Sequence, residues 1–221
     1  MAKLYGPSLA PQAGGPPRQL VVLLHGVGAD GNDLIGLAPM LAQRLPHAQF
    51  VAPDAPEPCD MAPYGRQWFS LQDRRPAVML AGARRTAPVL DAYLDELLQH
   101  HGLDDSRLAL VGFSQGTMMS LFVGPRRRRP VAAILGFSGA LLGAAELAGE
   151  LRSRPPVMLI HGDADDVVPV QALFMAVEGL QAAEIPVQWI VRPHLPHSID
   201  PAGIDAGGRF LRDMLAAGIT T

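Results

Sequence analysis

The sequence predicts one domain of the α/β class, with a mostly parallel central sheet and helices on both of its faces. Short apolar runs of strand length alternate along the chain with segments of helical periodicity. The run QLVVLLH at residues 19–25 lacks the alternation of a half-exposed strand, which indicates burial on both faces. A length of 221 residues suits a single domain with a sizeable core.

Taken in chain order, the elements fit this class. Apolar runs predict strands at residues 19–25, 48–52, 107–112, 131–137, 157–161 and 187–192. Apolar residues at helical spacing predict helices at residues 33–45, 85–101, 115–123, 170–183 and 204–217. Gly102 is expected to end the second helix. The Pro-rich connection at 53–76 is longer than an ordinary turn, so we expect a binding loop there.

The ends of the chain and its single cysteine bear on domain limits and compartment. Residues 1–18 are rich in proline and glycine and are expected to form a flexible leader before a single domain at 19–217. The N-terminus has no apolar segment of signal-peptide type, and no stretch is long enough to span a membrane. Cys59 has no partner for an intramolecular disulfide. A cytoplasmic location is therefore expected.

The charge distribution argues against nucleic acid as a partner. The formal net charge is -3, with both signs spread along the chain, so the sequence lacks the basic field that nucleic-acid binding requires. The one basic run, Arg126 to Arg129, lies between a predicted helix and a predicted strand. We interpret it as a solvated loop. Docking of an anionic substrate or a membrane surface is the alternative.

The motif G-x-S-x-G occurs once between a predicted strand and a predicted helix, at Gly112 to Gly116. A sharp strand-to-helix turn strains the serine backbone, so the residues two positions to either side must be nearly free of side chain. The turn exposes the serine hydroxyl at the positive end of the next helix, where developing negative charge is stabilised. Ser114 is therefore predicted to be a catalytic nucleophile.

A serine hydroxyl needs a base and an orienting carboxylate, and both follow in the chain. Asp163, Asp165 and Asp166 come directly after the predicted strand at 157–161, and their spacing does not decide which one is used. Of the two histidines after the strand at 187–192, His197 lies directly before the final helical region and suits the base, whereas His194 is expected to be solvated. The order serine, acid, histidine is that of α/β-hydrolases.

Two backbone amides are expected to hold the oxyanion of an acyl intermediate. One is the amide of Gln115, which follows the nucleophile, and the other is that of Val27 in the glycine-rich turn after the first strand. The glycines of that turn also fit G-x-G-x-x-G, a dinucleotide-binding pattern. That reading is disfavoured, because the acidic residue after the next strand, Asp54, begins a Pro-rich loop.

The sequence resembles the bacterial phospholipase/carboxylesterase family, which is related to the acyl-protein thioesterases. The resemblance runs from Gln19 to Leu215 and rests on five blocks: LLHGVGADGNDL, GRQWFSLQ, VGFSQGTMMSL, HGDADDVVP and PHSI. It implies an α/β-hydrolase fold with Asp165 as the acid and His197 as the base. It also implies that Trp68 and Phe69 form the wall of an acyl pocket.

Further implications of the resemblance concern the reaction. Members act without metal or organic cofactor on short-chain esters, lysophospholipids or acyl thioesters, so a small-molecule ester or thioester is the expected substrate of a carboxylesterase. The short stretch between Phe137 and Pro155 leaves no room for a cap domain. Residues 193–196 (PHLP) replace a glycine that the family places before the catalytic histidine, which leaves the register of that loop open.

Other function classes remain as alternatives. The chain could be a non-catalytic ligand-binding module on a hydrolase fold, although an intact triad and both oxyanion elements argue against it. Peptidase activity is disfavoured by the missing cap and the short chain. Stable membrane insertion is not expected. The sequence leaves a homodimer possible and does not fix the acyl-chain length.

Overall fold

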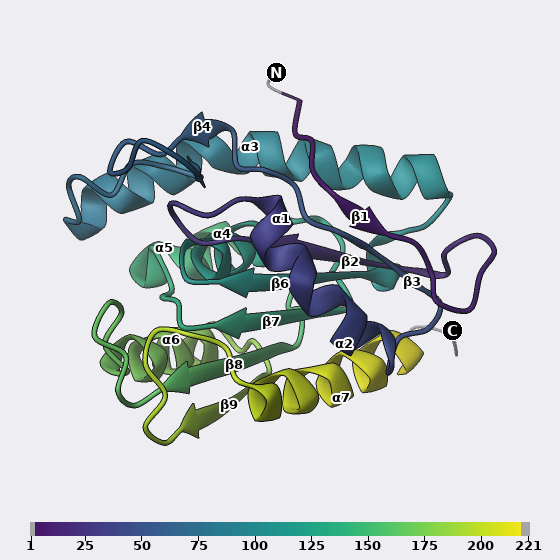
Figure 1. Ribbon diagram of the computed structural model, residues 1–221. Helices are drawn as coiled ribbons and strands as arrows, with labels where there is room; N and C mark the ends of the chain where they lie inside the picture. The colour runs from purple at the N-terminus through teal and green to yellow at the C-terminus, as the bar shows by residue number, and fades with distance from the viewer. Residues whose placement is uncertain (1–2, 218–221) are drawn as a thin grey trace.

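The computed structural model describes residues 3–217. Its centre is a seven-stranded sheet in the order β1-β3-β2-β6-β7-β8-β9, in which β1 runs antiparallel to β3 and the other neighbours run parallel (Figure 1). The strands of this sheet are β1 (Ser8–Leu9), β2 (Gln19–Leu24), β3 (Ala48–Val51), β6 (Leu108–Phe113), β7 (Ala133–Phe137), β8 (Val157–Gly162) and β9 (Val187–Arg192). A separate ladder pairs β4 (Glu57–Pro58) with β5 (Arg66–Gln67). The mostly parallel sheet expected from the apolar runs is confirmed.

Helices cover both faces of the sheet (Figure 1). They are α1 (Gly31–Leu34), α2 (Ala38–Ala42), α3 (Pro76–His101), α4 (Gln115–Val123), α5 (Ala144–Glu150), α6 (Gln171–Ala182) and α7 (Pro201–Ala217), with 3-10 turns η1 (Ile35–Leu37), η2 (Asp105–Arg107) and η3 (Gly124–Arg126). One apolar core packs α3, α4, α5 and α6 on one face. A second core packs α1, α2 and α7 on the other. Burial on both faces explains why the central strands β2, β6, β7 and β8 are almost continuously apolar, whereas the edge strand β9 is partly exposed and contains polar residues.

Two helices differ from the sequence-based expectation. The helix expected at 85–101 begins at Pro76, because a proline at the first helical position lacks only an amide that would have no partner there. It ends where predicted, before Gly102 at φ 64°. The single helix expected at 33–45 is instead divided into α1, η1 and α2. Pro39 in α2 has no amide to continue the bonding of the preceding turn, which accounts for the break.

Part of the leader that was expected to be flexible pairs with the sheet. Ser8–Leu9 forms the edge strand β1, and Leu4 is buried. The amide of Ala52 donates to the carbonyl of Pro7, and that of Asp54 donates to the carbonyl of Tyr5. Backbone pairing thus overrides the Pro- and Gly-rich composition. Residues 1 and 2 lie outside the described part of the chain.

The topology gathers functional loops at one edge of the sheet. Parallel strands end at the same edge, so the segments after β2, β6, β7, β8 and β9 lie side by side there (Figure 1). These segments contain the predicted site residues at positions 27, 114, 165 and 197. Within residues 3–217, no helix is both long and apolar enough to cross a bilayer.

Candidate active site

Ser114 occupies a strained turn between β6 and α4. Its backbone angles are φ 53° and ψ -114°, a region that residues with a side chain rarely adopt. The Ser114 amide donates to the carbonyl of Phe137 at 2.9 Å, which ties the turn to the end of β7. Strain of this kind persists only where surrounding contacts impose it, and it concentrates at functional sites.

The two glycines that flank Ser114 are required by close contacts. A Cβ at Gly116 would lie 1.8 Å from the carbonyl oxygen of Leu24 in β2. A Cβ at Gly112 would lie 2.4 Å from the amide nitrogen of Thr117. In both cases the nearest atoms belong to the backbone, so a side chain could be accommodated only by displacing β2 or α4. The spacing of the G-x-S-x-G motif therefore has a packing cause in this fold.

The loops after β8 and β9 bring Asp165 and His197 together. His197 Nδ1 and Asp165 Oδ2 are 2.7 Å apart, within hydrogen-bonding range. The other carboxylate oxygen, Oδ1, accepts hydrogen bonds from the amides of Val167 and Val168 at 3.0 and 2.8 Å. This Asx-type turn fixes the carboxylate before it meets the imidazole. The other two acids of the loop, Asp163 and Asp166, are exposed.

The environment of Asp165 keeps its carboxyl group ionised. Its side chain is fully buried, and burial by itself raises the pKa. Hydrogen bonds from His197 and from the amides of Val168 and Val167 outweigh burial, so the pKa of Asp165 is lowered below its usual value. An ionised carboxylate can hold the His197 ring in the tautomer that leaves Nε2 free to accept a proton.

A second histidine contacts the same carboxylate. His161 is buried at the end of β8, and its Nε2 lies 2.7 Å from the carbonyl oxygen of Val168 and 3.3 Å from Asp165 Oδ2. A proton on Nε2 satisfies the carbonyl and faces the carboxylate. His161 therefore supports the loop that contains Asp165, and the sequence did not indicate this contact.

His197 lies beside the serine turn without a hydrogen bond to it. The His197 ring packs against the ring of Phe113, with centroids 4.8 Å apart, and Phe113 directly precedes Ser114. Among the hydrogen bonds within residues 3–217, none joins the Ser114 hydroxyl to the His197 ring. In enzymes without substrate this bond is often long and shortens only in the reacting complex. The three predicted residues thus share one edge, with the acid and base already paired.

The loop at 193–196 has a defined register despite its two prolines. The carbonyl of Leu195 accepts from the amide of Ala164 at 3.1 Å, next to the acid. Asp163 accepts from the amide of His194 at 2.6 Å, while the His194 side chain is exposed. A Cβ at Gly162 would lie 2.0 Å from the Leu195 carbonyl oxygen, so β8 and this loop are in direct backbone contact. These contacts connect the loop after β8, which contains Asp165, to the loop after β9, which contains His197.

The turn that carries Val27 lies against the nucleophile. A Cβ at Gly26 would be 3.3 Å from the Cβ of Ser114, so the two turns touch. Within the described residues, the amide of Val27 donates no hydrogen bond, whereas the Gly28 amide donates to Arg66 at 2.9 Å. The Gln115 amide is at the first position of α4, where helical amides have no intrahelical partner. Both amides are thus available to an anion.

Trp68 and Phe69 differ from the expectation that they line an acyl pocket. Both side chains are fully buried in the core on the α3 face of the sheet. The indole Nε1 of Trp68 donates to the carbonyl of His25 at 3.0 Å, behind the turn that holds Val27. Neither side chain has surface with which to contact a substrate. Their apolar bulk favours the core, and they support the site from within.

Comparison with known proteins fixes the family. The family model described as Phospholipase/Carboxylesterase matches residues 10–215, which is nearly the whole chain. The chain belongs to this family. It therefore has the α/β-hydrolase fold, and the described element between β7 and β8 is the short helix α5 rather than a cap domain. The resemblance seen in the sequence blocks is confirmed.

Relatives of this family member are hydrolases. The crystal structure of esterase PE8 is 43% identical and superposes with a TM-score of 0.92, covering 96% of this chain and 99% of that one. Acyl-protein thioesterase 1 of Gibberella zeae is 28% identical over 88% of this chain and 90% of its own length. Esterase YpfH of Escherichia coli is 29% identical over 84% and 78% of the two chains. Esterase and thioesterase relatives support a hydrolase acting on esters or thioesters.

The described side chains offer no obvious metal centre. Across residues 3–217, no three His, Cys, Asp or Glu side chains gather as potential metal ligands.

Sequence analysis missed the polar contacts that hold the turn with Val27. His25 is buried, and its Nε2 accepts from the amide of Ala55 at 3.0 Å while Nδ1 lies 2.7 Å from the carbonyl of Gly26. Burial lowers the pKa of His25, so the ring stays neutral with its proton on Nδ1. Arg66 donates from its side chain to the carbonyls of Ala55 and Pro56. The signal available in the sequence was the presence of His25-Gly26 and Gly65-Arg66 in two of the blocks that carry the family resemblance.

The role of the Gln115 side chain could not be predicted from the sequence, because the motif marks only the backbone amide of this position. The fully buried Gln115 carboxamide accepts from the Trp68 amide at 2.9 Å and donates to the Phe69 carbonyl at 2.7 Å. Thr86 of α3 donates to the Trp68 carbonyl at 2.6 Å. Gln115 thus fastens the segment between β5 and α3 to the first turn of α4.

Replacing Gln115 by methionine should destabilise the protein while leaving the catalytic side chains in place. The change keeps the side-chain length but strands a buried amide and a buried carbonyl, each costing about 1 to 3 kcal/mol. We expect a lower midpoint in chemical unfolding with an unchanged denaturant slope. Gln72→Met, at an exposed position of the same loop, is the control. Equal stability of the two variants would contradict the fastening role.

Proposed function

We propose that this protein is a serine carboxylesterase that hydrolyses small carboxylic esters or thioesters through an acyl-enzyme. Ser114 is the nucleophile, His197 the general base and acid, and Asp165 the group that orients the imidazole. The amides of Val27 and Gln115 stabilise the oxyanion. The reaction needs no metal or organic cofactor, and small molecules are the substrates.

The residues divide the reaction into two balanced steps. In the first, Ser114 Oγ bonds to the acyl carbon while its proton passes to His197 Nε2, and the alcohol or thiol leaves with that proton. In the second, water attacks the acyl carbon, gives its proton to His197, and releases the acid as the proton returns to Oγ. Each oxyanion amide contributes on the order of 100- to 1000-fold to the rate.

The observation that carries the proposal is the 2.7 Å contact between Asp165 and His197 at the edge where Ser114 emerges. A buried, ionised carboxylate on the far nitrogen of a histidine is the arrangement that a general base needs. The strained backbone of Ser114 supports it independently, because strain without function would be costly to maintain.

The surroundings favour short acyl groups. A hollow of about 480 Å³ beside Val27 is lined by Gly28, Ala29, Asp30, Asp33, Tyr64 and Gly65. Tyr64 is 72% exposed and Val167, next to the acid, is 48% exposed, so both can contact a substrate. The sequence analysis named neither residue. Because Asp30 and Asp33 line the hollow and Trp68 and Phe69 are buried, a long acyl chain would find little apolar surface to contact there.

A non-catalytic ligand-binding module is the alternative function. Labelling by a fluorophosphonate separates the two, because only an activated serine displaces the fluoride. We expect stoichiometric labelling that is lost in Ser114→Ala and kept in Ser120→Ala, a serine of the same helix whose hydroxyl bonds the Gly116 carbonyl. An unlabelled wild-type protein would favour the binding module.

Acyl-chain preference is a further prediction of this proposal. Along p-nitrophenyl acetate, butyrate, octanoate and palmitate, kcat/KM should peak at the short esters and fall at least about tenfold by palmitate, because added methylenes gain no buried surface. A parallel series of acyl thioesters shows whether sulfur is preferred to oxygen. A steady rise to palmitate would contradict the short-chain assignment.

A further inference from the structure

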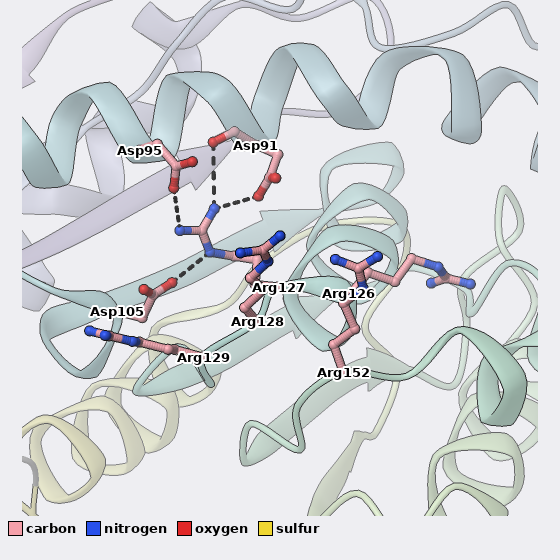
Figure 2. Close-up of a pocket in the computed structure, with 8 residues that line it drawn as sticks. All are labelled: Asp91, Asp95, Asp105, Arg126, Arg127, Arg128, Arg129 and Arg152. Atoms are coloured by element: carbon pink, nitrogen blue, oxygen red, sulfur yellow. Dashed lines mark hydrogen bonds and ion pairs between the residues drawn. The ribbon is translucent and has the colours of Figure 1, made fainter.

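A cluster of arginines lies at the edge of the sheet opposite the candidate active site. Arg126 to Arg129 follow α4, which begins at Gln115, directly after Ser114, and runs away from it for nine residues, roughly 13 Å. Arg152 joins them because its amide donates to the carbonyl of Pro125 at 2.9 Å. With Asp91, Asp95 and Asp105 these five arginines line a hollow of about 490 Å³ (Figure 2).

Arg127 forms the rigid floor of this hollow. Its side chain is 6% exposed and pairs with Asp91, with Asp95 at 2.7 Å and with Asp105 at 2.7 Å. Figure 2 shows the guanidinium reaching up from its loop to the two acids of α3. Three carboxylates around one cation more than neutralise it, so Arg127 is a structural anchor and is not available to a ligand. It ties the segment of Arg126 to Arg129 to α3 and to η2.

Arg126 is also engaged. Its guanidinium donates to Glu150 of α5 at 2.6 Å and stacks over the ring of Phe122, 3.8 Å from the centroid. Glu150 in turn accepts from Arg84 of α3 at 2.6 Å. This network links α3, α5 and the end of α4. Ion pairs of Arg126 and Arg127 thus position the walls of the hollow, and its other arginines take no part in these pairs.

Three arginines of the hollow have exposed side chains and form no ion pair within residues 3–217: Arg128, Arg129 and Arg152. The eight residues lining the hollow carry a net charge of +2, and Glu150, which pairs with Arg126, lowers the charge of the group to +1, whereas the whole protein carries -3. Clustered like charges repel one another, and a bound anion would remove this cost.

We propose that this hollow binds the phosphate group of a phosphorylated ligand, held by Arg128, Arg129 and Arg152. A guanidinium presents paired donors that match phosphate oxygens, and several free cations suit a multiply charged group better than a single carboxylate. The volume lies within the range of small-molecule sites. The site is remote from Ser114, so the inference does not depend on the proposed esterase activity.

Calorimetric titration with inorganic pyrophosphate at low ionic strength tests this site on the full chain. The wild type should bind, with affinity falling as sodium chloride is added. The variant R128A/R129A/R152A should bind at least about tenfold more weakly. The control R18A/R74A/R212A removes the same charge at exposed positions elsewhere and should stay within about twofold of the wild type. Circular dichroism melts and p-nitrophenyl butyrate hydrolysis verify that both variants are folded.

A second arm distinguishes a free phosphate from a lipid headgroup. Sedimentation with vesicles of phosphatidylcholine, with and without phosphatidic acid, shows whether the same arginines bind a membrane phosphate. Arginine-dependent binding in either arm supports the phosphate site and names its source. Absence of binding in both arms, or equal weakening in the control variant, would overturn it. If the triple variant does not fold, R128Q/R152Q is measured in its place.

Discussion

Ser114→Ala should reduce the hydrolysis of p-nitrophenyl butyrate by roughly three to six orders of magnitude, since removing one member of a triad costs about as much as removing all of it. The hydroxyl is the atom that forms the acyl bond, and the residues around it cannot replace it. Residual activity should match the contribution of the oxyanion amides and of binding. Steady-state rates measured with highly purified protein provide the value.

The strain at Ser114 gives this prediction a matched partner. Ser114→Gly also removes the hydroxyl, but glycine adopts φ 53° and ψ -114° without steric cost. Ser114→Gly should therefore be equally inactive and roughly 1 kcal/mol more stable than Ser114→Ala, a rise of about 2 to 4 °C in Tm. Near wild-type activity in either variant would remove Ser114 from the mechanism. Equal melting temperatures would show that the turn stores no strain.

Asp165→Asn should lower kcat by roughly 1000- to 10,000-fold with little change in the fold. An asparagine amide facing Nδ1 of His197 favours the tautomer with the proton on Nε2, which can no longer accept the proton of Ser114. Asp166→Asn removes the same charge from an exposed neighbour and should remain active. A comparable loss in both variants would show that the net charge of the loop, rather than the 2.7 Å contact, matters.

Stability against pH separates this role from simple packing. The pKa of Asp165 in the folded protein lies below its usual value of 3.8, so the ionised carboxylate stabilises the fold. This contribution is complete at pH values above the usual pKa and is lost as the pH falls through the lowered one. The stability difference between wild type and Asp165→Asn should thus be largest near neutrality and shrink below about pH 4. A difference that grows in acid would contradict the lowered pKa.

Much of the architecture could be predicted from local pattern. Each of the six predicted runs is a parallel strand, and the continuous apolar runs of the central strands mark burial on both faces, whereas the edge strand β9 is partly exposed. The misses have local causes. Pro76 reads as part of a loop but begins α3, and Pro39 divides a helix whose apolar spacing alone appears unbroken. The leader contains no apolar run, so its pairing with β3 depended on a partner distant in sequence.

In the candidate site, too, some features follow from the local sequence and others depend on packing. Ser114 is marked by its neighbours, because the close approach of Leu24 and Thr117 demands glycine on either side. Trp68 and Phe69 illustrate the opposite case. Aromatic residues in a long loop suit a pocket wall and a core equally well, and only the packing of α3 and the Gln115 carboxamide decides for the core.

The sequence by itself determined the fold class, the family and the chemical types of the site residues, because strand burial and turn sterics constrain residues close together in the chain and each site residue lies in a recognisable block of its own. Spacing left three acids open and the family resemblance pointed to Asp165, but only the tertiary structure showed which contacts hold the turn with Val27, where Trp68 and Phe69 pack, and which arginines within residues 3–217 form no ion pair. Those outcomes depend on side chains that are far apart in sequence and meet only where parallel strands end together. The spacing of residues along the chain gives no information about such long-range contacts.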